Sequence, residues 1–214
     1  MTNSESATKR ADREGPYHHG DLRNALVRAA AELAETGGPE AVTVRAAARL
    51  AGVTPTAAYR HFTNHDQLLG AAQTAAQQSL FMAMSAGVES LGPQAHAILR
   101  LNAVGRGYIA FAMQEPGLFR TAFCETGPVD GSPEDSPAFN LLSTLLDELV
   151  EIGYMDQVHR PDAEIAAWAT VHGLAGLMVD GPIPGLDDAA REQAITHTLA
   201  VVQRGLATGP NVPA

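Results

Sequence analysis

The sequence predicts an all-α protein. Apolar residues recur at helical spacing along most of the chain, and no stretch shows the strict alternation of a half-buried strand. Glycine and proline separate the helical stretches, at positions where helices commonly end. We therefore expect helices over residues 21–36, 43–51, 54–62, 64–85, 93–114, 116–124, 136–152, 161–180 and 187–207.

Two of these helices follow each other closely within TVRAAARLAGVTPTAAYRHF, residues 43–62. Thr43 is a good N-cap for the first helix, and Gly52 offers the left-handed position that ends it. Thr54 caps the second helix, and Pro55 suits its first position. Two short helices joined by a tight glycine turn have helix-turn-helix spacing, although the same pair also occurs as plain packing in helical bundles.

The side chains on this helix pair favour DNA binding over plain packing. They offer hydrogen-bond donors for phosphates and base edges on a scaffold of small residues. The residues that we expect to be exposed are Arg45, Thr54, Thr56, Tyr59, Arg60 and His61.

The charge distribution points to the same part of the chain. The 214 residues carry a net charge of −10, but the chain up to Phe62 has a net charge of +1 and the remainder has −11. Only the N-terminal part therefore suits a polyanionic partner, and the acidic remainder should face away from it.

TVRAAARLAGV, followed by TPTAAYRHF and by Asn64, Asp66, Leu68 and Leu69, resembles the DNA-binding domain of the TetR-type (TetR/AcrR) transcriptional regulator family. The preceding YHHGDLRNALVRAAAELAETGG, residues 17–38, is similar to the first helix of that domain. The resemblance covers roughly the first third of the chain. It implies a three-helix head that binds double-stranded operator DNA, with contacts from Thr43, Arg45, Pro55, Thr56, Ala57, Tyr59 and His61.

One position departs from the family pattern. The family usually carries a lysine just after the recognition helix, and this chain has His65 there. Because histidine is largely uncharged at neutral pH, we expect any phosphate contact from His65 to be weaker or pH-dependent.

The resemblance and the helix pattern together imply two domains joined by a long helix. Residues 1–16 should form a flexible arm, whose Lys9, Arg10 and Arg13 either touch DNA or are simply solvated. We expect a helix-turn-helix DNA-binding domain over 17–66, a helical effector-binding and dimerisation domain over 67–207, and a disordered tail over 208–214. The connecting helix starts at Asn64, with Gln67 in capping-box register.

Two C-terminal helices have the pattern of a dimer interface. Gly173 and Gly176 in helix 161–180 would let another helix approach closely, which compensates for glycine's low helix propensity. Helix 187–207 adds a continuous apolar stripe, so two helices per subunit would build a four-helix interface. The expected interface residues are Trp168, Gly173, Gly176, Ile195, Leu199, Val202 and Leu206.

The run WATVHG, residues 168–173, also resembles the Trp-then-His-Gly (WHG) signature of one TetR subgroup. This resemblance implies an effector-binding domain, for which we expect a small apolar or amphipathic effector. Candidate pocket residues are Asn102, Arg106, Phe111, Phe119, Phe123, Trp168, His172 and Met178. All except Asn102 have a simpler alternative: the aromatic residues and Met178 as ordinary core, Arg106 as a surface or interhelix ion pair, and His172 as a hydrogen-bonded core residue.

Other classes of protein fit the sequence less well. The N-terminus has no apolar signal region and no later stretch is long and apolar enough to span a membrane, so we expect a cytoplasmic protein with no membrane partner. Cys124 is the single cysteine, which excludes an intrachain disulfide, and we read it as a buried or incidental thiol. No catalytic motif or metal-ligand cluster is present, so we expect neither a cofactor nor a metal.

These observations predict a ligand-responsive homodimeric transcriptional repressor that binds a pseudo-palindromic operator. One alternative is a DNA-binding activator or regulator without a small-molecule effector. A helical enzyme is a remote alternative.

Overall fold

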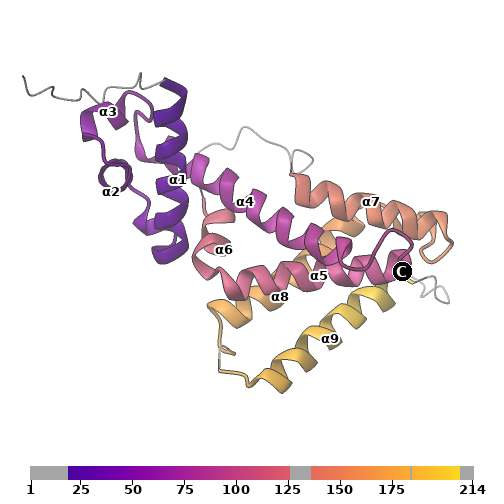
Figure 1. Cartoon of the computed structure of the whole chain (residues 1–214). Coiled ribbons are helices and arrows are strands. Elements are labelled where there is room, and N and C mark those ends of the chain that lie inside the picture. The colour runs from indigo at the N-terminus through magenta and orange to yellow at the C-terminus, as the bar shows by residue number, and fades with distance from the viewer. Residues whose placement is uncertain (1–18, 126–135, 184, 208–214) are drawn as a thin grey trace, which may run out of the picture.

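The computed structural model describes residues 19–125, 136–183 and 185–207, and within these ranges the regular structure is helical (Figure 1). The predicted arm over 1–16 and tail over 208–214 lie outside the described residues. Two short 3-10 segments are η1 (Pro39–Ala41) and η3 (Gln157–His159). The α-helices are α1 (His19–Gly37), α2 (Val44–Leu50), α3 (Pro55–Tyr59), α4 (His65–Glu89), α5 (Ala97–Gln114), α6 (Pro116–Ala122), α7 (Pro137–Glu151), α8 (Ala163–Val179) and α9 (Asp188–Leu206).

The first three helices form a compact head at one end of the molecule (Figure 1). Their apolar faces meet in one core, to which the first turns of α4 contribute Leu68, Leu69 and Ala72. The core of the head therefore includes residues beyond 66, the predicted end of the DNA-binding domain.

Helix α4 runs from the head into the body of the molecule (Figure 1). Its start has the predicted cap: the Gln67 amide N–H donates to Asn64 Oδ1 at 2.9 Å, and the Thr63 N–H donates to Gln67 Oε1 at 3.0 Å. The helix continues to Glu89, four residues beyond the predicted end. Helix α5 packs on α4 so closely that a Cβ at Gly107 would lie 2.6 Å from the carbonyl oxygen of Ala83.

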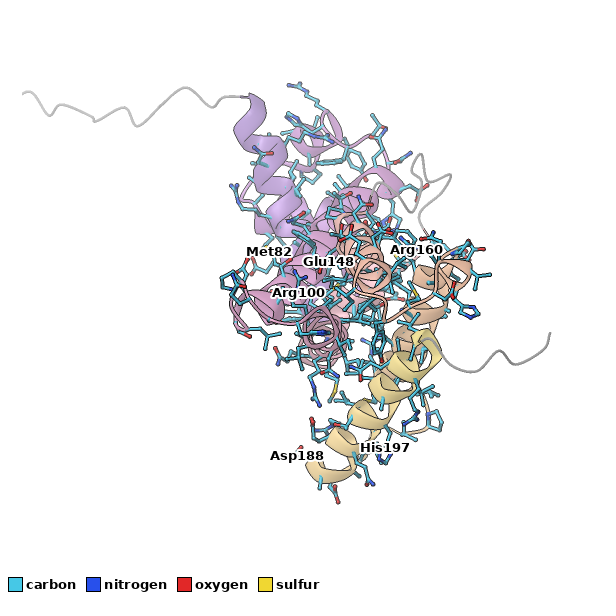
Figure 2. All side chains as sticks on the ribbon, turned by 90° about the vertical axis from the view of Figure 1, so that its right-hand side faces the viewer. Met82, Arg100, Glu148, Arg160, Asp188 and His197 are labelled. Carbon is cyan, nitrogen blue, oxygen red and sulfur yellow. The ribbon has the colours of Figure 1, made fainter. Side chains whose placement is uncertain are left out.

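The body is built from α4 to α9 around two neighbouring apolar clusters. The larger one lies between α4, α5, α6, α7, α8 and α9, and the smaller one lies between α5, α7, α8 and α9. Ion pairs tie the outer helices together at the side of α7. Arg100 of α5 pairs with Glu148 of α7, as Figure 2 shows, and Arg160 reaches both Asp147 at 2.6 Å and Glu164 at 2.7 Å.

Helix α9 packs inward along the stripe that we expected to face a second subunit. Leu199 and Leu206 are buried, and Leu199 lies against Gly105 of α5. Ile195 and Val202 are partly buried and pack against the two clusters of the body. Leu199 and Leu206 therefore offer no surface to a partner, which corrects their assignment to a dimer interface, while the assignment of the partly exposed Ile195 and Val202 stays a prediction. Figure 2 shows Asp188 and His197 on the part of α9 that stands out from the body.

None of the helices in the described part of the chain combines the length and apolar composition that a membrane-spanning helix needs.

Candidate DNA-binding surface and effector groove

The two helices of the predicted helix-turn-helix are held by the caps that the sequence suggested. The Ala46 N–H donates to Thr43 Oγ1 at 3.1 Å, and the Ala57 N–H donates to Thr54 Oγ1 at 3.3 Å. Gly52 adopts a φ of 71° between the helices, a conformation in which other residues are strained. These local contacts determine where α2 and α3 begin and how the chain turns between them.

Helix α3 is shorter than predicted. Its regular part ends at Tyr59, and the chain continues in a tight turn in which the His61 N–H donates to the Ala58 carbonyl at 2.9 Å. Ala58 and Phe62 are buried in the core of the head, and this anchors the inner side of the helix. The opposite side of α3 is not covered by the core of the head.

The structure buries none of the ten residues predicted to contact DNA. They come from the start of α2, from α3 and its following turn, and from the start of α4. Ala57 and His61 are half-buried; the exposed ones are Thr43, Arg45, Thr54, Pro55, Thr56, Tyr59, Arg60 and His65.

Arg23 of α1 supports the end of this surface, and the sequence pattern gave no sign of it. Its Nη1 donates to the backbone carbonyl of His61 at 3.1 Å, and its guanidinium lies 4.4 Å from the centre of the Phe62 ring. Both contacts hold the turn after α3 against α1, so Arg23 positions the reading surface without being part of it.

Arg23→Ala is expected to destabilise the head by about 1–2 kcal/mol, from the loss of one hydrogen bond and one cation–π contact. Amide hydrogen exchange over residues 55–62 should become faster, because local opening reports local stability. Arg28→Ala is the matched control, since Arg28 is an exposed arginine on the same helix. Equal exchange rates in the two variants would show that the Arg23 contacts carry no stability.

The body contains an open groove of about 380 Å³ between α4, α6, α7 and α8. Its walls are mostly apolar and aromatic, as is typical of small-molecule sites. The described residues that line it are Gln77, Phe123, Ser136, Phe139, Ile165, Trp168, Ala169 and His172.

Three of the eight predicted pocket residues line this groove, namely Phe123, Trp168 and His172. Phe119 is buried behind them, with its ring centre 5.4 Å from that of His172. Phe111 and Met178 are buried in the main cluster of the body, so for them the simpler alternative of ordinary core is correct.

Asn102 and Arg106 lie elsewhere. Arg106 pairs with Glu192 of α9 at 2.8 Å, and its Nε donates to Asn102 Oδ1 at 3.1 Å. The predicted alternative of an interhelix ion pair is therefore correct for Arg106. Asn102 lines a second, smaller cavity of about 40 Å³, whose wall also includes Trp168.

A hydrogen bond connects the groove to the interior. The Tyr108 hydroxyl and Nδ1 of His172 are 2.7 Å apart. Burial raises the pKa of Tyr108 above its ordinary value, and burial lowers the pKa of His172. At neutral pH both side chains are therefore uncharged, and they form a neutral pair at the base of the groove.

The chain matches two family models that describe the two halves of one type of regulator. Residues 26–72 match "Bacterial regulatory proteins, tetR family", and residues 101–202 match "Tetracyclin repressor-like, C-terminal domain". Together the matches span more than two thirds of the chain, and the first contains the whole helix-turn-helix. The chain belongs to the TetR family. It is a DNA-binding transcription regulator with a helix-turn-helix head.

Solved structures show the same fold. A protein of unknown function from Rhodococcus sp. RHA1 is 28% identical, with a TM-score of 0.73 over 91% of this chain and 100% of the other. A putative TetR regulator from Shewanella sp. PV-4 is 16% identical, with a TM-score of 0.66 over 88% of this chain and 99% of the other. A TetR regulator from Streptomyces coelicolor is 23% identical, with a TM-score of 0.61 over 87% and 99%. No curated protein matches the chain.

In this TetR-family chain, α6 lies between the groove and the head. Leu118 packs against the cores of both domains, and Phe123 at the end of α6 lines the groove. A Cβ at Gly117 would lie 2.2 Å from the carbonyl oxygen of Ala34, so the start of α6 touches the backbone of α1. A shift of α6 would therefore change its contact with α1 in the head.

Two glutamines of α4 hold the other end of α6. Gln73 Nε2 donates to the Cys124 carbonyl at 3.0 Å, and Gln77 Nε2 donates to the Ala122 carbonyl at 3.2 Å. These bonds satisfy carbonyl groups that the end of a helix leaves without intrahelical partners. Because Gln77 also lines the groove, a bound molecule would meet the contact between α4 and α6 directly.

The exposed side of α8 is unusual for a surface helix. Its exposed residues between 165 and 177 are all apolar or small: Ile165, Ala166, Ala169, Gly173 and Leu177. A Cβ at Gly173 or at Gly176 would meet no atom of the described chain within 4 Å. The close helix approach that we predicted at these glycines is thus not made within the chain. Trp168, the remaining residue of the predicted interface, lies partly buried in the groove.

Proposed function

We propose that this TetR-family regulator is a homodimeric repressor whose affinity for a pseudo-palindromic operator is controlled by a small molecule bound in the body. The observation that carries the proposal is the position of α6, which contacts the groove through Phe123 and the head through Gly117 and Leu118. A ligand in the groove that displaces Phe123 would therefore move α6 and, through it, the head that carries the DNA-reading surface.

Helix α3 is the element proposed to enter the major groove of the operator. In a symmetric dimer two such helices lie about one DNA turn apart, roughly 34 Å, and read two half-sites of opposite orientation. Thr56 and Ala57 are proposed to contact thymine methyl groups, and Arg45 is proposed to form paired hydrogen bonds with a guanine edge. Pro55 is the first residue of α3, and this exposed end of the helix lies against the DNA in the proposed complex.

The remaining polar residues are proposed to contact phosphates. The Thr43 and Thr54 hydroxyl oxygens accept the capping bonds, which leaves their O–H groups available to donate to phosphate. Further donors to the backbone of the operator are Tyr59, Arg60, His61 and His65.

The proposed role of Arg45 leads to a prediction about specificity. Arg45→Ala should weaken binding to the preferred operator by about 1–3 kcal/mol, while binding to unrelated DNA changes less, so that discrimination falls. Fluorescence anisotropy at one salt concentration, with the operator and a scrambled duplex, measures this. Arg204→Ala removes the same charge from an exposed position on α9 and is the matched control. Unaltered discrimination in Arg45→Ala would remove Arg45 from the base-reading set.

The experiment that tests the function as a whole is selection of bound duplexes from random DNA. We expect an enriched site with two inverted half-sites whose centres are one helical turn apart. Enrichment of a single, asymmetric half-site would exclude the proposed mode of operator binding.

The part of the exposed face of α8 that carries Ala166, Gly173 and Leu177 is proposed as the dimer interface, and Ile165 and Ala169 beside it remain walls of the groove. A helix face of apolar and small residues that meets nothing in its own chain gains free energy when a second copy covers it. Val201 of α9, which is 53% exposed, extends this surface. The proposal keeps Gly173 and Gly176 from the sequence prediction and replaces the inward stripe of α9 by the outward face of α8.

Ligand control is proposed to follow from differential affinity. A molecule that fits the groove better when α6 is displaced must weaken the binding of the operator. By linkage, the operator weakens the binding of that molecule by the same factor. The groove supports this mechanism over that of a regulator without an effector, for which a solid body is the simplest expectation. The position of Trp168 and His172 at the groove also supports membership of the subgroup with the WHG signature.

A further inference from the structure

Aromatic side chains are concentrated around the groove. The chain has one tryptophan and six phenylalanines, and Trp168, Phe119, Phe123 and Phe139 all lie in one group of contacting rings. The ring centres of Phe123 and His172 are 4.8 Å apart, and the rings meet edge to face. In a chain with only 5% aromatic residues, this concentration makes a surface suited to a planar aromatic molecule.

Charge complementarity restricts that molecule further. Among the described residues that line the groove there is no aspartate, glutamate, lysine or arginine. A charged group placed there would lose its hydration without gaining a partner, which is costly. The described walls of the groove therefore favour an uncharged molecule.

The Tyr108–His172 contact defines the polar group that the molecule must carry. The Tyr108 hydroxyl is buried, and among the described residues its hydrogen-bond partners are His172 Nδ1 and the Trp168 side chain, whose indole N–H can only donate. If Nδ1 carried the proton, the hydroxyl hydrogen would have no acceptor, and such a buried unsatisfied group is strongly disfavoured. Tyr108 therefore donates to Nδ1, and the proton of the neutral imidazole is on Nε2.

The Nε2–H group of His172 is available to a ligand. The described residues provide it with no hydrogen-bond partner, it is not sealed from solvent, and its ring lines the groove. It offers one oriented donor in an otherwise apolar site, which is how small-molecule sites obtain specificity.

We infer that the effector of this regulator is an uncharged aromatic molecule that carries a hydrogen-bond acceptor, such as a carbonyl oxygen, and that His172 Nε2–H donates to that acceptor. This inference rests on the proposed function for its regulatory meaning, but the binding site can be tested without DNA. Tyr108 acts as a positioning residue, because it orients the imidazole and selects its tautomer.

Three naphthalene derivatives of similar shape test the inference by calorimetric titration of the full chain. The probes are 2-acetylnaphthalene, which has an acceptor, 2-isopropylnaphthalene, which has none, and 2-naphthoate, which is charged. We expect the ketone to bind roughly tenfold more tightly than the hydrocarbon and more tightly than the carboxylate. Equal affinity for ketone and hydrocarbon, tightest binding of the carboxylate, or no detectable binding of the ketone would overturn the inference.

Two variants locate the interaction. In His172→Phe the preference for the ketone over the hydrocarbon should disappear, because phenylalanine fills similar space but cannot donate. In Tyr108→Phe the preference should shrink while the hydrocarbon affinity stays unchanged, and this variant gives an answer even if His172→Phe does not fold. A preference that persists unchanged in Tyr108→Phe would exclude the proposed tautomer control. Each variant is checked for folding by circular dichroism.

Operator binding is measured separately, with and without the ketone. Ketone binding that follows the expected pattern but leaves operator affinity unchanged would support the site and contradict the proposed ligand response. Absence of ketone binding in a protein that still recognises a pseudo-palindromic operator would overturn the site and leave DNA recognition in place.

Discussion

The substitution Gly117→Ala is expected to lower the free energy of unfolding by about 1–3 kcal/mol and to weaken operator binding by roughly tenfold or more. A Cβ at this position would lie 2.2 Å from the Ala34 carbonyl oxygen and 2.5 Å from that of Glu35. Both oxygens belong to the backbone of α1 and cannot rotate away as a side chain would. Helix α6 must therefore move off the head, which disturbs the contact that joins the two domains.

Chemical denaturation and operator titration at a fixed salt concentration measure the two effects. Gly70→Ala is the matched control, because Gly70 lies in the interior of α4 and a Cβ there would meet no atom within 4 Å. That control should be up to about 1 kcal/mol more stable than the wild type, since alanine favours a helix more than glycine does. If Gly117→Ala matched the control in both measurements, the close contact between α6 and α1 would be refuted.

Gly173→Arg is expected to convert the proposed dimer into monomers. Within its own chain the new side chain has open space, so the fold of each subunit should be retained. Across the proposed interface the two substituted helices would place bulk and like charge where the apolar faces must meet. Loss of the dimer removes the second reading head, and affinity for a full operator should fall by roughly 10²–10⁴.

Analytical ultracentrifugation measures the oligomeric state, and titrations with a full operator and an isolated half-site measure the affinity. Only the full operator should lose affinity, because a single head still reads one half-site. Ala86→Arg adds the same charge at an exposed position on α4 and should remain dimeric. A Gly173→Arg protein that sediments as a dimer would place the interface on another surface.

The features that sequence reasoning predicted correctly depend on short stretches of chain. Thr43, Thr54 and Asn64 cap α2, α3 and α4 as expected, because a cap needs only a side chain and an amide three residues away. The starts and ends of the later helices were predicted within a few residues for the same reason, except that α5 begins at Ala97 instead of residue 93. There His96 caps the helix after a proline-containing turn.

The candidate effector site was predicted only in part. Trp168 and His172 stand one turn apart on α8, so their shared face could be read from helical periodicity. Tyr108 could not be associated with them, because 64 residues separate it from His172. Phe139 and Gln77 come from two further helices, and no local pattern relates their positions to α8.

Arg23 shows the same limit in the DNA-binding head. Its contacts are with the His61 carbonyl and the Phe62 ring, which lie almost 40 residues further along the chain. In the sequence it is one of the two arginines of α1. Only the packing of α1 against α3 distinguishes it.

By itself the sequence determined where the helices lie, how they are capped, and which segment forms the helix-turn-helix, because each depends on contacts within a few residues. Tertiary structure decided which partner each apolar face meets. The stripe on α9 was recognised as continuous, yet Leu199 within it packs against α5 of the same chain. Helix α8 is apolar around nearly its whole circumference, so periodicity could not distinguish its buried face from the face left open around Gly173.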